Sequence, residues 1–294
     1  GSRGHRRYRR ENAINKLFEE NWMQLEVNRL VLGTAQFGSD YGISNRAGQP
    51  SKAKIFEILS LAWESGIRRF DTAPDYDSEK ILGEFIRAHG VGDIVKVSTK
   101  IAKIKTAYDY RNIIRQELDK SVDLLGCSID VLFMHNASDA DLFIIGPEYF
   151  QDLLGNYPIH SFGVSVYEPS EVFLLQQSQF DLAVQFPLNI LDQRFEQLEL
   201  TPGKLYARSI FLQGLLASKN YLKPCAPKSL VKFHSIYHRL LLEQGLDPIS
   251  CALSFVFSSD AMNFVLLGVA FLLTDVKKHD KISSSSRRVD WSSF

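Results

Sequence analysis

The sequence predicts an α/β protein folded as a (β/α)8 TIM barrel, a single domain with an N-terminal extension. Three observations favour this fold. From residue 27 onward, short apolar runs typical of buried strands alternate with amphipathic helical patterns. Eight such runs fit within about 265 residues, the usual size of such a barrel. The helix-opening GxGxxG turn of a doubly wound sheet is missing, since no helical pattern directly follows Gly33–Gly38.

The elements are expected in a regular order. The strands are expected at residues 28–35, 67–73, 94–100, 129–135, 161–166, 182–187, 204–210 and 264–269. Amphipathic helices are expected at 52–65, 78–88, 107–125, 231–244 and 249–257, each with apolar side chains recurring on one side. The apolar run 264–273 has ten residues, fewer than the about 20 that a membrane-spanning helix needs. It is therefore interpreted as a buried strand that runs into its loop.

Residues 1–26 differ in composition from the rest of the chain. They include five arginines near the start, namely Arg3, Arg6, Arg7, Arg9 and Arg10, and lack the apolar segment of a secretory signal. We interpret 1–26 as a basic N-terminal leader or linker and 27–294 as the barrel. Two alternatives stay open: the arginines form an anion-binding arm, or the chain belongs to a longer protein with another domain fused at its N-terminus.

Composition excludes several classes of partner. The 34 basic and 34 acidic residues give a formal net charge of zero, so neither a nucleic acid nor a membrane is expected as a partner. Apolar residues make up 45% and charged residues 23% of the chain, as in soluble globular proteins. The three cysteines, Cys127, Cys225 and Cys251, are scattered and form no metal-binding motif. No metal is expected, and a reducing, cytoplasmic location is the simplest interpretation.

Four titratable residues stand at the ends of three successive predicted strands. Asp71 and Tyr76 follow the second strand, Lys100 closes the third, and His135 closes the fourth. In a parallel barrel the carboxyl ends of all strands open onto one face, where such folds carry their chemistry. Each residue alone fits an ordinary structural role, such as a turn, a rim contact or a solvated strand end. The four together predict a catalytic site.

The chemistry of these four side chains indicates a proton donor with its tuning partners. An ammonium at Lys100 would stabilise the phenolate of Tyr76 and lower its pKa, while Asp71 would keep Lys100 charged. His135 would bind and orient a substrate carbonyl oxygen. No nucleophile paired with a base and no second catalytic carboxylate is evident, which disfavours acyl transfer and glycoside hydrolysis.

These motifs resemble the aldo-keto reductase family over residues 28–270. The family's D-x-A-x-x-Y segment is similar to residues 71–76, and its lysine and histidine motifs are similar to 98–100 and 132–135. The first strand and loop are similar to 32–38. Further similar segments occur in the same order at 162–165, 184–189 and 207–216.

The resemblance implies a carbonyl–alcohol oxidoreductase. Tyr76 would be the general acid, Lys100 and Asp71 would tune it, and His135 would position the carbonyl. A nicotinamide cofactor across the barrel mouth would deliver the hydride. The implied cofactor-binding residues are Gly33, Thr34, Ser165, Gln185, Arg208, Ser209, Gln213, Gly214 and Gly268.

A small-molecule carbonyl, polar or sugar-like, is the expected substrate, because polar residues are placed to line the mouth. The expected substrate contacts are Gln36, Phe37 and Asn136, with Asp75 and Arg208 nearby.

Two departures from the family pattern concern the cofactor. Family members often place a side chain that stacks on the nicotinamide where this chain has Arg208; a guanidinium can stack too, or pair with an acidic substrate. Residues 268–275 are apolar where the family's basic or hydroxyl residues hold the 2′-phosphate of NADP. Lys277 and Lys278 follow, and are interpreted as a solvated helix face. NADP is the expected cofactor because it is the family default, although these residues weaken the expectation, and NAD is the alternative.

Two other functions stay open. The barrel would serve as a cofactor-binding sensor or regulatory module attached to another protein, or it would use transient oxidation of a sugar for epimerisation or elimination. Substrate identity, reaction direction and oligomeric state do not follow from the sequence.

Overall fold

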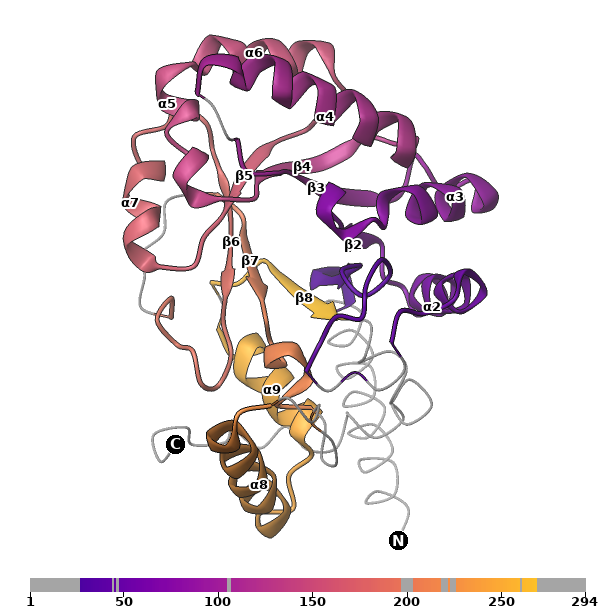
Figure 1. The fold of residues 1–294 in the computed structure, drawn as a ribbon, viewed down its shortest axis with the longest axis vertical. Helices are drawn as coiled ribbons and strands as arrows, with labels where there is room; N and C mark the ends of the chain where they lie inside the picture. Colours follow the sequence, from indigo (N-terminus) through magenta and orange to yellow (C-terminus); the bar gives the residue numbers. More distant parts are fainter. Residues whose placement is uncertain are drawn as a thin grey trace, which may run out of the picture.

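A closed parallel barrel forms the centre of the molecule (Figure 1). The computed structural model describes residues 27–43, 45, 48–104, 107–196, 203–217, 222, 226–259 and 261–268. Eight strands pair in chain order, and β8 pairs with β1 to close the ring. The predicted fold class is confirmed. The strands are β1 Leu30–Gly33, β2 Arg69–Asp71, β3 Lys96–Ile101, β4 Ile129–Met134, β5 Phe162–Ser165, β6 Ala183–Pro187, β7 Leu205–Arg208 and β8 Phe264–Gly268.

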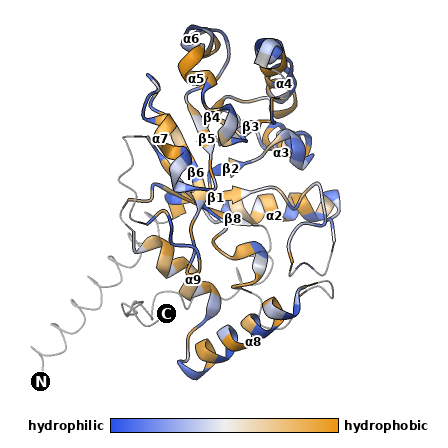
Figure 2. Cartoon of the chain, turned by 60° about the vertical axis from the view of Figure 1, so that its left-hand side comes forward, coloured by the Kyte–Doolittle hydropathy of each residue, from blue (hydrophilic) through white to orange (hydrophobic). Residues whose placement is uncertain are grey.

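Helices surround the barrel, and three of the longer ones, α3, α4 and α8, carry both hydrophobic and hydrophilic residues (Figure 2). The Ser51 side chain caps α2 by accepting a bond from the Lys54 amide. Gly90 and Gly126 end two others in the left-handed conformation that glycine adopts most easily. The helices are α2 Lys52–Glu64, α3 Glu79–His89, α4 Tyr110–Leu125, α5 Leu142–Ile145, α6 Pro147–Asn156, α7 Val172–Leu175, α8 Lys228–Glu243 and α9 Pro248–Phe257.

The five predicted helices correspond to α2, α3, α4, α8 and α9, with boundaries that differ by up to three residues. Three helices were not predicted, namely α5, α6 and α7. The two of four residues each, α5 and α7, are too short for a periodic pattern. Between β6 and β7, the described residues contain no helix. The alternation of strand and helix is therefore less regular than the sequence indicates.

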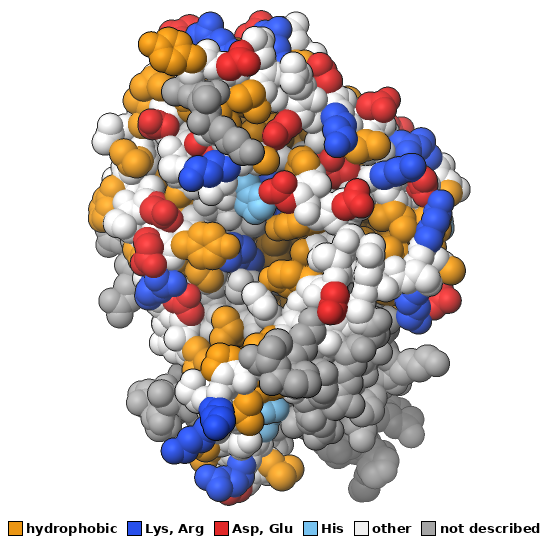
Figure 3. Space-filling model, in the orientation of Figure 1, with side chains coloured by type: hydrophobic (Ala, Val, Ile, Leu, Met, Phe, Trp, Pro, Cys, Tyr) orange, Lys and Arg blue, Asp and Glu red, His pale blue; other side chains and the backbone are white. Residues whose placement is uncertain are grey.

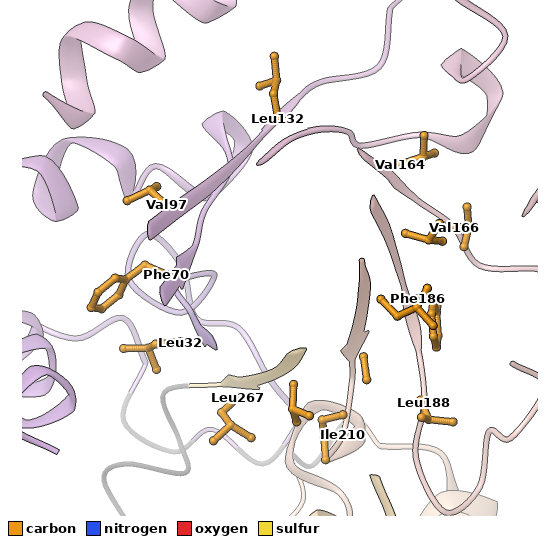
Figure 4. Close-up of a cluster of buried hydrophobic side chains, with 14 of the residues drawn as sticks. Leu32, Phe70, Val97, Leu132, Val164, Val166, Phe186, Leu188, Ile210 and Leu267 are labelled. Atoms are coloured by element: carbon orange, nitrogen blue, oxygen red, sulfur yellow. The ribbon is translucent and has the colours of Figure 1, made fainter. Parts of the chain in front are cut away.

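The main hydrophobic core lies between the strands and the surrounding helices. Figure 4 shows its strand side chains pointing away from the barrel axis, among them Leu32, Phe70, Val97, Leu132, Val164, Phe186 and Leu267. These side chains are at most 3% exposed. Burial of apolar surface from every strand holds the ring of strands in place.

A second, smaller cluster fills the barrel interior. It consists of Val31, Val131, Phe133, Ala183, Tyr206 and Leu266. The Phe133 and Tyr206 rings meet edge to face, with centroids 5.4 Å apart. Lower in the barrel, Arg69 pairs with Asp130 at 2.7 Å. The described interior of the barrel is therefore packed like a core.

Several predictions lie outside the described residues. These are the leader at 1–26, the loop after β8 from residue 269, and Lys277 and Lys278. Among the described helices, none alone has the length and apolar character to cross a membrane. The pair α8 and α9 meets that test only jointly, and is bent by 89°.

Candidate active site

The carboxyl ends of the strands bring the predicted site residues to one end of the barrel. Side chains two residues apart on a strand lie on the same face. Five residues of the interior cluster are each followed, two positions later along the chain, by a residue at this end of the barrel. These followers are Gly33, His135, Gln185, Arg208 and Gly268, after Val31, Phe133, Ala183, Tyr206 and Leu266 respectively. Asp71, Lys100 and Ser165 complete this end on β2, β3 and β5. We call this ring of eight residues, one from each strand or its end, the barrel mouth.

A buried ion pair lies at the centre of the mouth. The Lys100 ammonium donates to Asp71 Oδ1 at 2.6 Å and to the Thr72 carbonyl at 2.8 Å, and Lys100 is only 1% exposed. Burial opposes the charge on Lys100, but Asp71 and Tyr76 outweigh it and raise the pKa of the ammonium above its usual value. Lys100 is therefore a cation at neutral pH.

Tyr76 lies directly beside this pair. It belongs to the 3-10 turn η1 (Pro74–Tyr76), which follows β2, and the Lys100 nitrogen is 4.8 Å from the centroid of its ring. Burial raises the pKa of the Tyr76 phenol, whereas the charges of Lys100 and Arg208 lower it, and the net direction is upward. Lys100 lowers the pKa of Tyr76 as the sequence predicts, but desolvation is the larger influence and the net pKa is raised. Tyr76 is thus protonated and able to donate at neutral pH.

His135 faces Tyr76 across the mouth. The two rings are perpendicular, with centroids 6.1 Å apart. Burial and the Lys100 charge lower the pKa of His135, while Asp75 acts in the opposite direction. The Asp75 carboxylate is 3.6 Å from His135 Nδ1, within ion-pair reach but beyond hydrogen-bond length. A neutral His135 between Tyr76 and Asp75 has a nitrogen available for a carbonyl oxygen.

Gln185 has a partner that the sequence did not indicate. Its amide nitrogen donates to Asp71 Oδ2 at 2.9 Å, so Asp71 is held by both Lys100 and Gln185. Ser165 is aligned with Gln185 on the neighbouring strand, and both are buried. The carbonyl oxygen of the Gln185 amide is the end of this side chain available to a ligand.

Two residues of the loop after β1 lie apart from the mouth. Thr34 is 0% exposed, and its hydroxyl binds the Asp71 carbonyl and the Ser78 hydroxyl. Phe37 is 2% exposed and packs in the main core. A direct cofactor contact for Thr34 and a substrate contact for Phe37 do not fit these placements, because the Thr34 hydroxyl is bound to Asp71 and Ser78 and Phe37 is packed into the main core. Gln36 binds the Tyr41 carbonyl, and Asn136 is half-buried next to His135.

The loop after β7 has an unusual backbone. Ser209, Leu212 and Gln213 have φ values of 60°, 44° and 55°, which non-glycine residues seldom adopt and which often mark functional loops. The side chain of Asn189 donates to the Ser209 carbonyl, and the Ile43 amide donates to the Gln213 carbonyl. The predicted cofactor loop is therefore tied to the β6 and β1 loops on either side.

Two glycines leave space for a side-chain carbon at the mouth. Gly33 and Gly268 are paired across β1 and β8. A Cβ at Gly268 would meet nothing within 4 Å, and one at Gly33 would meet only the Leu267 carbonyl, at 3.5 Å. With the Ser165 hydroxyl and the Gln185 amide nearby, the residues present fit a nicotinamide, which needs an open face and polar partners for its carboxamide.

Two rim residues were missed by the sequence analysis. Tyr167 lies under the Arg208 guanidinium, 4.1 Å from ring centroid to Cζ. Tyr41 lies within electrostatic reach of Tyr76, Tyr167 and Arg208. Figure 3 shows histidine, acidic, basic and hydrophobic side chains meeting near the centre of the face viewed. The position of these tyrosines in loops, outside any periodic pattern, left no sequence signal.

Comparison with known proteins agrees with this geometry. A family model described as the Aldo/keto reductase family matches residues 29–273. The chain is 24% identical to pyridoxal 4-dehydrogenase of Microbacterium luteolum, covering 83% of this chain and 86% of that protein. It is 27% identical to the chloroplastic pyridoxal reductase of Arabidopsis thaliana, covering 79% and 70%.

A solved structure shows the same fold. The glycerol dehydrogenase of Gluconobacter oxydans superposes with a TM-score of 0.62 at 22% identity, covering 82% of each chain. The family match spans most of the present chain, including every described strand and the residues Asp71, Tyr76, Lys100 and His135. The chain therefore belongs to the aldo/keto reductase family, whose members are oxidoreductases of carbonyls and alcohols.

Proposed function

We propose that this protein interconverts a carbonyl and an alcohol with NADP(H) or NAD(H), using Tyr76 as the general acid. The observation that carries the proposal is the buried Lys100–Asp71 pair at 2.6 Å, next to Tyr76 and opposite His135. When bound, the cofactor supplies the hydride for the carbonyl carbon. The protein must then supply a proton to the oxygen and stabilise the developing charge.

Each residue has a separate part in that task. Tyr76 is neutral at physiological pH, since its ordinary pKa lies near 10 and burial raises the pKa further. It can therefore donate its proton to the carbonyl oxygen. As the phenolate forms, the Lys100 ammonium stabilises it. Asp71 fixes Lys100 in place with the help of Gln185. His135 holds the carbonyl oxygen near the Tyr76 hydroxyl.

The cofactor would lie across the mouth. Ser165 and Gln185 would bind the carboxamide, Arg208 would adjoin the ring, and the loop containing Ser209, Gln213 and Gly214 would cover the pyrophosphate. The paired glycines Gly33 and Gly268 support this placement because they leave the required space open. NADP and NAD both remain in this proposal.

A small polar carbonyl is the proposed substrate class. The names of the related proteins point the same way, since they refer to pyridoxal and glycerol. In this chain, Gln36, Asn136 and the exposed Asp75 would provide polar contacts, and the rings of Tyr41 and Tyr167 would provide flat apolar surfaces at the rim. Sugar-like and pyridine-based aldehydes both fit this combination.

The decisive test is turnover by the Tyr76→Phe variant. Oxidation of NADPH and NADH should be followed with a panel of small polar aldehydes, including pyridoxal and aldoses. We expect kcat to fall by about 10²- to 10⁴-fold, because a general acid typically contributes that much. Cofactor affinity should stay close to that of the unaltered protein.

The matched control is Tyr108→Phe, at a fully exposed tyrosine. Full turnover by Tyr76→Phe would refute the assigned acid. Tight cofactor binding without turnover of any carbonyl by the unaltered protein would favour the sensor function. Conversion of a sugar without net cofactor consumption would favour an epimerase or lyase.

A further inference from the structure

Arg208 is a fixed cation at the mouth. Its Nη2 donates to the Val166 carbonyl at 3.0 Å, and its Nη1 donates to the Ser209 hydroxyl at 3.3 Å. The guanidinium also lies over the Tyr167 ring. Three contacts from two loops therefore hold the charged group of a half-buried residue in one place.

The charge of Arg208 is not neutralised by an ion pair. Its three partners are a carbonyl, a hydroxyl and a phenol ring, and within the described part of the chain no carboxylate is paired with it. Lys100 differs, because Asp71 compensates its charge. The exposed arginines Arg115 and Arg194 likewise have carboxylate partners. Arg208 is thus a positive charge without a carboxylate partner of its own at this end of the barrel. Asp75 is a separate, exposed negative charge near His135, and the Asp192 carboxylate within electrostatic reach of Arg208 is paired with Arg194.

The field of this charge reaches the reacting groups. Arg208 stands on the interior face of β7, two residues beyond Tyr206, so its side chain is directed to the mouth. Burial has the largest influence on both pKa values: it raises the pKa of Tyr76 and lowers the pKa of His135. The Arg208 charge has a smaller influence, and it lowers the pKa of both groups. A nicotinamide ring that delivers a hydride must lie next to the carbonyl group, which is bound between Tyr76 and His135. The ring therefore lies within the electric field of Arg208 as well.

We propose that Arg208 makes this protein bind the reduced nicotinamide ring in preference to the oxidised ring. The inference rests on the proposed function. When the reduced ring gives its hydride to the carbonyl carbon and Tyr76 gives its proton to the oxygen, the neutral ring becomes a cation. An unpaired guanidinium nearby disfavours that cation. The consequence is weaker binding, and faster release, of the oxidised cofactor.

The ratio of two dissociation constants isolates this effect. The oxidised and reduced cofactors carry the same phosphates, so contacts of the pyrophosphate cancel when the two affinities are divided. The ratio of the two dissociation constants therefore reports only how the protein responds to the charge and shape of the nicotinamide ring. A unit charge a few ångströms away changes such a ratio by about fivefold when it is screened as in bulk water, and by more where screening is weaker. A change of about tenfold is therefore the least that we expect at a mouth open to solvent.

The test is a titration of the full chain with NADP⁺, NADPH, NAD⁺ and NADH, followed by protein fluorescence at fixed ionic strength. For Arg208→Gln, we expect the ratio of Kd for the oxidised form to Kd for the reduced form to fall at least about tenfold, mainly through tighter binding of the oxidised form. Arg208→Lys keeps the charge and should retain most of the ratio. Arg115→Gln, which removes an equal charge from a surface ion pair on α4, should leave the ratio unchanged.

Several outcomes would overturn the proposal. An unchanged ratio in Arg208→Gln would show that the protein does not sense ring charge through this residue. If Arg208→Gln bound the oxidised and the reduced cofactor more weakly by the same factor, Arg208 would be a general cofactor contact and the proposal would be wrong. A rise in KM confined to acidic carbonyl substrates, with the ratio unchanged, would assign Arg208 to the substrate. If the unaltered protein bound neither form, the proposed function itself would fail.

Folding of the variants is checked by thermal unfolding. If Arg208→Gln does not fold, Arg208→Met replaces it, because an unbranched apolar side chain can keep the contact with Tyr167 without the charge. The same fall in the ratio is expected for that variant, and an unchanged ratio overturns the proposal in the same way.

Discussion

At the scale of single residues, Asp71 organises the site. Its carboxylate binds Lys100 through one oxygen and Gln185 through the other, and its backbone carbonyl accepts the Thr34 amide. One residue therefore links β2 to β1, β3 and β6. A buried carboxylate with both oxygens bonded holds its partners in fixed positions, and a fixed ammonium can stabilise a phenolate without reorganisation.

The charge state of His135 leads to a prediction about Asp75. The pKa of His135 is lowered by burial and by Lys100, and Asp75 partly offsets this. Because the folded pKa lies below the ordinary value, the neutral imidazole stabilises the fold above about pH 6.5, and this stabilisation is lost as pH falls through the folded pKa. Removing the Asp75 carboxylate in Asp75→Asn should shift the protonation of His135 to still lower pH.

This shift can be measured as the NMR titration midpoint of the His135 ring. Asp77→Asn, which removes the same charge from an exposed neighbour of the turn, serves as the control and should leave the midpoint in place. A midpoint that stays or rises in Asp75→Asn would contradict the prediction, and would mean that the 3.6 Å contact has no electrostatic effect in solution.

At the scale of elements, close contacts between helices depend on small residues. In α3, a Cβ placed on Gly83 would overlap with the Leu124 carbonyl at the end of α4. The backbone of α4 cannot move away easily, because Leu118 and Leu125 of the same helix are fully buried. The approach of α3 to α4 therefore requires glycine at this position.

We expect Gly83→Ala to lower the free energy of unfolding by about 1–3 kcal/mol, as overpacking usually does. Gly155→Ala in α6 is the matched substitution, because a Cβ there would meet nothing within 4 Å. It should raise the free energy of unfolding by up to about 1 kcal/mol, the usual advantage of alanine over glycine in a helix. Urea denaturation of both variants checks the pair. If both substitutions changed the free energy of unfolding by the same amount, helix propensity, and not the α3–α4 contact, would determine the stability of Gly83→Ala.

At the scale of the whole molecule, stability and chemistry occupy opposite ends of the barrel. The mouth holds the Lys100–Asp71 pair, while the other end holds the Arg69–Asp130 pair and the Phe264 ring over which Arg69 lies. The interior cluster around Tyr206 separates the two ends. A change at the lower end should therefore affect stability without affecting ligand binding.

Arg69→Met tests this separation. The variant should lose about 1–3 kcal/mol of unfolding free energy, because it leaves the largely buried Asp130 carboxylate unpaired. Adding Asp130→Asn should restore part of the loss. Urea denaturation gives the stability, and fluorescence titration gives the cofactor affinity, which should be unchanged in both variants. A weakened affinity at equal folded fraction would show that the two ends are coupled.

The order of strands and the residues at their ends followed from the sequence alone. In a parallel barrel every carboxyl end faces the same way, so locating the ends of β2, β3 and β4 was enough to place Asp71, Lys100 and His135 together. The helix α6 was missed for a physical reason. Its buried residues Tyr149, Phe150 and Leu153 do recur at helical spacing, but the helix has only ten residues, so this apolar repeat spans little more than one turn and does not stand out in the sequence.

Only the tertiary structure decided which side chains meet and how deeply each is buried. Gln185 and Asp71 are 114 positions apart in the chain, and their hydrogen bond depends on closure of the barrel. Desolvation of Tyr76 outweighs the lowering of its pKa by Lys100. Thr34 and Phe37, which were expected to contact ligands, are instead packed inside the protein. Sequence patterns encode which face of an element is apolar, because periodicity is local. Burial and charge compensation, as at Arg208, are sums over neighbours from many elements, and these exist only in the folded molecule.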